Sequence, residues 1–169
     1  MVTKRYSYVL AMVLLMLIGA CNRPDVDMKS KRIATAERYF RGVYTSDTTV
    51  VDDLTGDDIV ISYPIFQSLY GTPAIRGREA VKAFITRFGQ KWADPQLDIH
   101  EAISDGNNVV LLWNFQARYV DTTQSNQPVS KQKRNWGGIT LFRFDPEGKI
   151  EAEIGEESEP GPTQRLNSS

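Results

Sequence analysis

The second half of the sequence is a succession of alternating segments, and this pattern constrains the fold more than any other feature. In the segment 109–120 every second residue is apolar, in the order Val109, Leu111, Trp113, Phe115 and Ala117. Such alternation is typical of a β-strand with one buried face. Comparable segments lie at 97–103, 135–144 and 149–157. The turn sequences Asp-Gly-Asn-Asn and Asp-Pro-Glu-Gly separate neighbouring segments, so we predict long antiparallel strands.

The first half of the chain carries helical spacing instead. Apolar residues recur at helical intervals from Ile33 to Val43, and a second amphipathic pattern covers 78–90. A short helix is expected at 50–54. Helices followed by a run of antiparallel strands are typical of the α+β class. We therefore predict a curved antiparallel β-sheet wrapped around two to three N-terminal helices, forming a cone with a pocket.

One strand and two irregular segments are expected among these helices. The segment 59–63 reads as a strand that ends at Pro64. Gly-Asp-Asp at 56–58 is expected to form a turn before it. A loop is expected over 71–77, which leads into the amphipathic helix.

The N-terminus predicts export and a lipid anchor. Lys4 and Arg5 precede an unbroken apolar run over 9–18, and small residues stand before Cys21. This order is typical of a secretory signal, and the run is shorter than the ~20 residues of a membrane-spanning helix. Leu-Ile-Gly-Ala-Cys resembles the lipobox of bacterial lipoproteins, which implies cleavage before Cys21 and acyl chains on it. We expect attachment to a bacterial membrane, the outer membrane (periplasmic side or cell surface) rather than the inner one.

An ordinary signal peptide that happens to be followed by a cysteine is the alternative. The predicted layout is a signal peptide at 1–20, a tether at 21–31, one domain at 32–158 and a disordered tail at 159–169. Because Cys21 is the only cysteine, the domain can form no internal disulfide.

The charge balance and the single histidine limit the possible functions. With 20 basic and 21 acidic residues the chain has no basic footprint for nucleic acid, so no nucleic-acid partner is expected. His100 lies out of phase with the apolar residues Leu97, Ile99 and Ile103, so we expect it to face away from them. One histidine supports neither a Ser-His-Asp triad nor a metal centre. No metal site and no cofactor are predicted.

Three motifs carry a resemblance to a known superfamily. They are GDDIVISYP at 56–64, IRGREAV at 75–81 and LFRFDPEGKI at 141–150. Together they resemble the nuclear-transport-factor-2-like superfamily over about residues 33–158, and within it the SnoaL-like polyketide cyclases and the ketosteroid isomerases. The resemblance implies a conical fold with an internal pocket.

The resemblance also shows where the catalytic groups of the family are replaced. Tyr39 matches the isomerase tyrosine that donates a hydrogen bond to the developing oxyanion. Tyr63 stands where the isomerases carry the carboxylate base, and Thr140 stands where they carry a second carboxyl group. A phenol is a poor base at neutral pH, and threonine cannot transfer the proton, so catalysis of the familiar kind is not expected.

Several side chains are expected to line the pocket. By the resemblance, the apolar sides of 109–120 and 135–144 point into the cone, and Tyr39 and Tyr63 could supply hydrogen bonds at its floor. The predicted pocket residues are Tyr39, Tyr63, Phe84, Trp113, Phe115, Trp136, Thr140, Phe142 and Glu153. Plain core packing is the alternative interpretation of this aromatic set.

The last strand contains the only acids expected to face inward. Ile150, Ala152 and Ile154 are expected on one face, and Glu151, Glu153 and Glu157 on the other. The resemblance implies that Glu153 points towards the cavity. A desolvated glutamate there would have a raised pKa and could act as acid or base; a solvent-facing strand is the alternative.

Three functions follow from these observations. The first is a membrane-anchored domain that binds a small, partly apolar ligand without family-type catalysis. The second is an isomerase, lyase or hydrolase that uses Glu153 with Tyr39 and Tyr63. The third is a structural or assembly partner that dimerises through the open sheet face, where Val110, Leu112 and Ile154 could contribute.

Overall fold

The computed structural model describes residues 24–120 and 133–166. Five helices are described in these ranges: α2 (Pro24–Thr45), α3 (Thr49–Leu54), α4 (Ile65–Tyr70), α5 (Arg78–Gly89) and α6 (Pro162–Leu166). The strands are β1 (Thr55–Ser62), β2 (Ile75–Arg76), β3 (Trp92–Ser104), β4 (Asn108–Tyr119), β5 (Lys133–Phe144) and β6 (Ile150–Ser158). Cys21, the predicted signal peptide and the loop expected at 121–131 lie outside the described residues.

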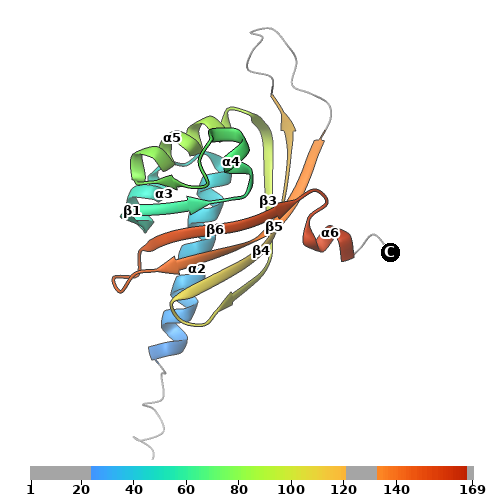
Figure 1. Ribbon diagram of the computed structural model, residues 1–169. Helices are drawn as coiled ribbons and strands as arrows, with labels where there is room; N and C mark the ends of the chain where they lie inside the picture. The colour runs from blue at the N-terminus through green and yellow to red at the C-terminus, as the bar shows by residue number, and fades with distance from the viewer. Residues whose placement is uncertain (1–23, 121–132, 167–169) are drawn as a thin grey trace, which may run out of the picture.

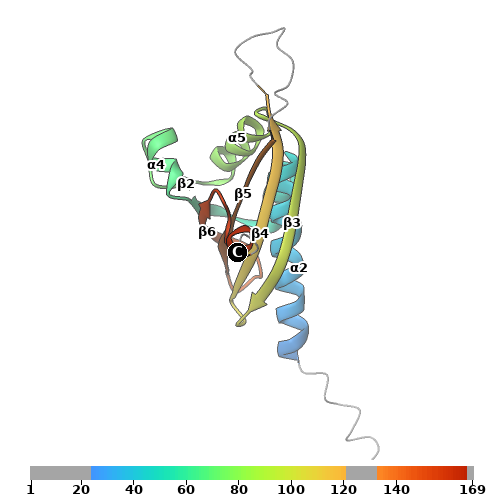
Figure 2. The ribbon, with the colours of Figure 1, turned by 90° about the vertical axis from the view of Figure 1, so that its right-hand side faces the viewer.

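The strands form one six-stranded sheet in the order β2-β1-β6-β5-β4-β3. Neighbours from β3 to β6 pair antiparallel, as do β1 and β2, whereas β1 runs parallel to β6. The long helix α2 passes behind β4, β5 and β6 in Figure 1, and α5 lies beside it on the same side. Figure 2 shows the strands bending along these helices. The predicted α+β class and its curved, mostly antiparallel sheet are confirmed.

The core lies between the helices and the inner face of this sheet. Side chains of β4 alternate between buried and partly exposed, as the sequence predicts. The largest fully buried side chains include Trp113, Tyr39, Phe40, Phe115 and Phe142. Phe40 makes edge-on contacts with both Trp113 and Phe142, at centroid distances of 5.3 and 5.6 Å. Aromatic packing therefore fixes α2 against the sheet.

The N-terminal half differs from the expectation in four places, one of which is the two-residue strand β2 inside the loop expected over 71–77. Helix α2 begins at Pro24, so most of the residues expected to form a tether are helical. The hexapeptide helix α4 was not predicted. Residues 56–58 belong to strand β1, so the turn expected there is wrong.

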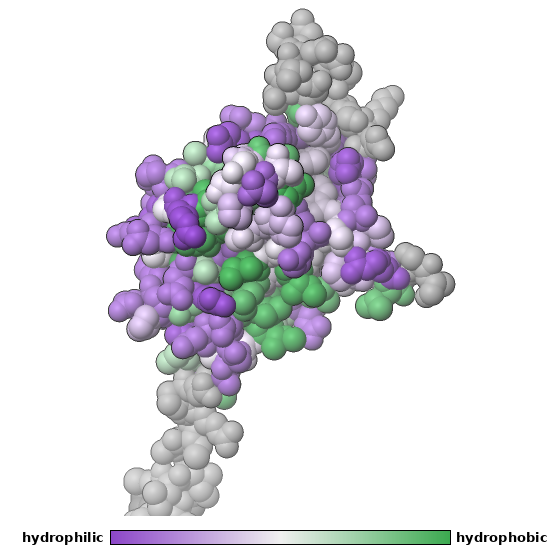
Figure 3. Space-filling view, in the orientation of Figure 1, coloured by the Kyte–Doolittle hydropathy of each residue, from purple (hydrophilic) through white to green (hydrophobic). Residues whose placement is uncertain are grey.

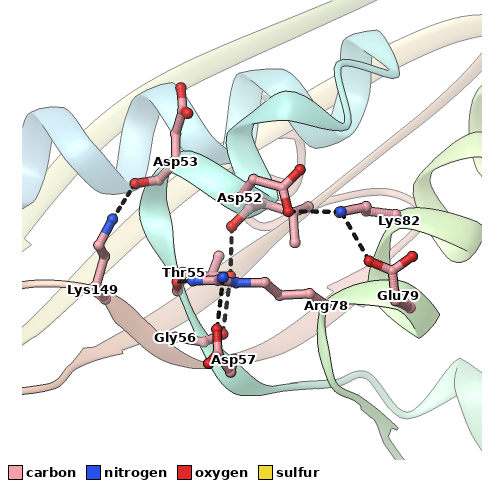
Figure 4. Close-up of polar contacts among 10 residues, drawn as sticks. Asp52, Asp53, Thr55, Gly56, Asp57, Arg78, Glu79, Lys82 and Lys149 are labelled. Carbon is pink, nitrogen blue, oxygen red and sulfur yellow. Dashed lines mark hydrogen bonds and ion pairs between the residues drawn. The ribbon is translucent and has the colours of Figure 1, made fainter.

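A polar network explains why residues 56–58 are extended (Figure 4). Arg78 forms an ion pair with Asp57 at 2.6 Å and donates a hydrogen bond to the carbonyl of Thr55. Lys82 pairs with Asp52 and Glu79 at 2.7 and 3.0 Å. These contacts join α3, β1 and α5, and local turn propensity cannot compete with tertiary contacts of this kind.

Irregularities in β3 and β6 change which residues face the helices. The pairing of β3 with β4 shifts between Ile99 and Glu101, and the pairing of β6 with β5 shifts between Ile150 and Ala152. An extra residue in one strand reverses the alternation of side chains beyond it. Ile103 is therefore exposed although Ile99 faces the core. The prediction that Ile150 and Ile154 share a face is wrong, because Ile150 is buried and Ile154 is exposed.

The C-terminal segment, for which the sequence predicts disorder, contains helix α6. It packs against β4 and β5 on the outer face of the sheet. The Thr163 hydroxyl donates to Asn114 Oδ1 at 2.8 Å, and the backbone at Gly161 passes close to Gly137. Within the described ranges, no helix has the length and apolar content needed to cross a membrane.

Candidate functional site

A cavity of about 580 Å³ opens between α4, α5 and the ends of the strands. Half of its lining residues are aromatic, namely Tyr44, Tyr63, Phe66, Tyr70, Phe84, Phe88, Trp92, Tyr119 and Trp136. The acids Glu153, Glu157 and Glu159 also line it, together with Lys91 and Arg134. Its volume lies within the range of pockets that hold small molecules, and its wall is mostly apolar.

Glu153 is the buried acid of this cavity. It comes from β6 and is 2% exposed. Burial raises the pKa of the Glu153 carboxyl to about 7, although a hydrogen bond from Tyr63 acts in the opposite direction. The group can therefore be protonated or ionised near neutral pH, which is a requirement for a general acid or base.

A directed chain of hydrogen bonds ends on Glu153. The Trp113 indole donates from Nε1 to Thr140 Oγ1 at 2.9 Å. The Tyr63 hydroxyl lies 3.2 Å from Thr140 Oγ1 and donates to Glu153 Oε1 at 2.6 Å. Because Tyr63 has only one proton and gives it to the carboxyl, Thr140 must be the donor to Tyr63. Each group thus orients the next, and Oε1 is held in place.

The second carboxyl oxygen lies away from the cavity, next to Tyr39. Glu153 Oε2 and the Tyr39 hydroxyl are both fully buried and have no other partner among the described residues. Burial, and then the charge of Glu153, raise the pKa of Tyr39 well above its ordinary value, and a hydrogen bond from Tyr39 lowers the pKa of Glu153. Tyr39 is therefore a neutral donor that orients the Glu153 carboxyl group from the core side.

Gly155 makes the position of Tyr63 possible. A Cβ atom at Gly155 would lie 2.0 Å from Cε1 of the Tyr63 ring. The ring therefore packs directly on the backbone of β6, which brings its hydroxyl to Glu153. Sequence reasoning missed this residue, and its only signal is a glycine inside a strand, which often marks a close approach.

Glu157 and Tyr44 also line the cavity, although they are not among the predicted pocket residues. Glu157 follows Glu153 and Gly155 on the inner face of β6, and burial raises its pKa above the ordinary value. Tyr44 is buried, and the charges of Glu157 and then Glu153 add to burial in raising its pKa. Its ring therefore lies near both acids.

The predicted pocket residues divide into two groups. Tyr63, Phe84, Trp136 and Glu153 line the cavity. The others are fully buried behind its wall and form part of the core, namely Tyr39, Trp113, Phe115, Thr140 and Phe142. Thr140 nonetheless belongs to the hydrogen-bond chain, and Tyr39 faces the same carboxyl group.

Metal ligation finds no support in the described ranges. No group of three or more His, Cys, Asp or Glu side chains there could hold a metal ion. His100 is exposed on β3, as expected.

The fold and its internal cavity define the class of protein. The six-stranded sheet with helices on its inner side is the nuclear-transport-factor-2-like fold. An NTF2-like protein of unknown function from Burkholderia pseudomallei shares it with a TM-score of 0.60 and 17% identity, covering 80% of this chain and 95% of that one.

Residues 36–153 match the SnoaL-like domain family, and the chain belongs to this family. A putative SnoaL-like polyketide cyclase from Jannaschia sp. CCS1 has a TM-score of 0.62 and 14% identity, with 83% of this chain and 92% of that chain covered. An LEH-like epoxide hydrolase from M. tuberculosis has a TM-score of 0.57 and 18% identity, with 78% and 85% covered. No curated protein matches the sequence significantly.

Proposed function

We propose that this domain binds a small, largely apolar molecule in the cavity, with a polar group of that molecule placed at Glu153. The observation that carries the proposal is an aromatic cavity of about 580 Å³ with the carboxyl group of Glu153 in its wall. The aromatic wall supplies the favourable burial of apolar surface. The polar group of the ligand would pair with this carboxyl group, which offsets the loss of hydration of both.

Calorimetric titration with 4-phenylbutanol tests this proposal. The alcohol has an apolar body that fits the cavity and a hydroxyl group that can pair with Glu153. We expect saturable binding, and about tenfold weaker binding to Trp136→Ala, because that ring contributes about 1.5 kcal/mol of contact. The control Val26→Ala changes an exposed residue on α2, outside the cavity and the outer face of the sheet, and should bind as the wild type does. If the wild type shows no binding, the proposal is wrong for this ligand class.

A second candidate function is proton transfer to or from the bound molecule. The observation that favours it is the position of Glu153, whose pKa is raised to about 7, in the wall of the cavity. The relatives with epoxide hydrolase and polyketide cyclase in their names suggest apolar substrates with a reactive oxygen. In this proposal Glu153 is the acid or base, and Tyr63, which also lines the cavity, holds its carboxyl group in position.

Hydrolysis of styrene oxide is a direct assay for this second candidate. General acid–base groups contribute about 10²- to 10⁴-fold to rate, so Glu153→Gln should lose a comparable factor. Glu156→Gln removes the same charge from the exposed neighbour and should keep full activity. Equal rates for Glu153→Gln and the wild type would exclude this role of Glu153 for that substrate.

We also propose that two copies of the chain associate through the outer face of the sheet. Ile103, Val110, Leu141 and Ile154 are paired in register across four strands, β3 to β6. Ile103, Ile139 and Ile154 are exposed on this face, where Figure 3 shows an apolar patch over the strands. Exposed apolar patches of this kind are typical of association surfaces.

The lipid anchor on Cys21 is proposed from the sequence of residues 4–21 alone. Mass spectrometry of the mature protein should find an acylated N-terminal cysteine. Cys21→Ser should move the protein from the membrane fraction to the soluble fraction if the signal is still cleaved. A wild-type protein that begins elsewhere or carries no lipid would contradict the proposal.

A further inference from the structure

The acids of the cavity outnumber its bases, and their arrangement points to the charge of the ligand. This inference rests on the proposed function and names the ligand class for the same cavity. Glu153 and Glu157 both line the cavity from β6, and their Cα atoms are about 13 Å apart along a strand that rises ~3.3 Å per residue. The Tyr63 ring packs on Gly155 between them and donates a hydrogen bond to Glu153. Glu157, which is only partly buried, is therefore the acid that a positively charged group of a ligand can reach.

Neither acid is neutralised by the protein. No ion pair within 24–120 and 133–166 joins Glu153 or Glu157 to a basic side chain. Arg134, one of the two bases in the lining, is already paired with Glu159. Lys91, the other, is exposed. The inner part of the cavity thus carries two carboxyl groups and no counter-charge.

Aromatic faces surround the same region. Trp136 lowers the pKa of Glu157 through a hydrogen bond, and its ring contacts Trp92 and Phe115 at centroid distances of 4.9 and 4.6 Å. Tyr44 approaches both acids and contacts Phe88 at 5.3 Å. The negative face of an aromatic ring attracts cations, most strongly where water is excluded. The carboxylates and the ring faces therefore both favour a positively charged ligand.

We infer that the cavity binds an apolar molecule that carries a protonated amine, with its ammonium group at Glu157 and against the rings of Tyr44 and Trp136. The ammonium group donates hydrogen bonds, which the Glu157 carboxylate can accept. An anionic ligand would be repelled by both acids. A neutral ligand would leave Glu157 without a counter-charge.

Three probes of matched size test this inference: 4-phenylbutylamine, 4-phenylbutanol and 4-phenylbutyrate, each titrated calorimetrically into the purified protein at pH 8. We expect the amine to bind at least about tenfold more tightly than the alcohol, and the carboxylate to bind least tightly. Glu157→Gln should weaken the amine about fivefold or more and leave the alcohol within about twofold. Glu156→Gln, which removes the same charge from an exposed neighbour, should leave all three affinities unchanged.

The outcomes separate the inference from the proposed function. If the alcohol binds as tightly as the amine, the preference for a cation is wrong while the binding pocket stands. If Glu157→Gln weakens amine and alcohol equally, the assigned role of Glu157 is wrong. If none of the three probes binds, the proposed function itself fails. The comparison of the three probes on the wild-type protein decides whether the cavity prefers a cation even if a variant does not fold.

Discussion

The buried carboxyl group of Glu153 destabilises the folded protein but suits ligand binding or proton transfer in the cavity. Its carboxyl group is buried, and the neutral hydroxyl groups of Tyr63 and Tyr39 are the hydrogen-bond donors beside it, with no basic side chain paired to it among the described residues. Burial of an incompletely paired charge disfavours ionisation, which is why the pKa rises to about 7 from the ordinary 4.5. A folded protein retains such a group at a cost in stability, and this cost can be measured.

The stability of the protein should fall as pH rises from about 4.5 to about 7. In this window the folded state binds the Glu153 proton and the unfolded state has lost it, so ionisation favours unfolding. The two pKa values correspond to about 3 kcal/mol at ~1.4 kcal/mol per pH unit. Urea unfolding at pH 4.5 and pH 8 should show a drop of this order relative to Glu153→Gln, which lacks the titration. Parallel pH profiles for the two proteins would contradict the assignment.

Gly155→Ala should displace Tyr63. The added methyl group would lie 2.0 Å from the Tyr63 ring, so the ring must move and its hydrogen bond to Glu153 is lost. We expect a loss of about 2–3 kcal/mol in the free energy of unfolding, measured by urea denaturation. Gly56→Ala is the matched strand control, because its Cβ would meet no atom closer than 3.7 Å. If Gly155→Ala and Gly56→Ala lower the free energy of unfolding equally, the position of the Tyr63 ring does not depend on Gly155.

At the level of elements, periodicity predicted most of the architecture. The alternation in 109–120 and the helical spacing in 78–90 correspond to β4 and α5 within one or two residues. These patterns are reliable because each element buries one continuous face against the same core. The inward position of Glu153 was implied by family resemblance, and the structure has it facing the cavity.

The structural features that the sequence does not predict depend on contacts between residues that are distant in the chain. The irregularity in β6 that separates Ile150 from Ile154 has no local sequence signal, because a bulge is specified by the neighbouring strand. The extended conformation of 56–58 depends on Arg78, and the packing of helix α6 on the sheet depends on Asn114. The sequence places Glu157 on the same face as Glu153, but its position in the cavity wall depends on Trp136 of β5 and Tyr44 of α2, which are distant in the sequence.

Helix α6 should contribute to the stability of the sheet. Truncation after Pro160 removes the hydrogen bond from Thr163 to Asn114 and uncovers the backbone at Gly137. Because a hydrogen bond is worth about 1 kcal/mol net, we expect a decrease of about 1–2 kcal/mol in the free energy of unfolding. Thr163→Val, which removes only the hydroxyl group, should show a smaller decrease. If truncation leaves stability unchanged, α6 is not a structural part of the domain.

The whole molecule has two apolar regions with separate roles in this account. One is the aromatic cavity on the inner side of the sheet, and the other is the exposed patch around Ile139 and Ile154 on the outer side (Figure 3). A mainly apolar cavity suits a ligand, whereas a flat apolar sheet face suits another protein surface. The two regions can therefore be tested independently.

Sedimentation at several concentrations should reveal association through the outer face. Ile139→Asp combined with Ile154→Asp places charges on the patch, so we expect the dimer to dissociate at least about tenfold more readily. Both residues are exposed, at 47% and 39%, so the fold should tolerate the change. Val26→Asp, at an exposed site on α2, is the control. A wild-type protein that remains monomeric at all concentrations would contradict the proposed interface.

The central claim is that the cavity beside Glu153 is a ligand site. The indole N–H signals of the three tryptophans test it most directly, because Trp92 and Trp136 line the cavity whereas Trp113 is buried behind its wall. In a ¹⁵N NMR titration with 4-phenylbutylamine, the account predicts saturable shifts of the Trp92 and Trp136 signals, with Trp113 affected less. Binding that leaves Trp92 and Trp136 unmoved, or no binding at all, would contradict it.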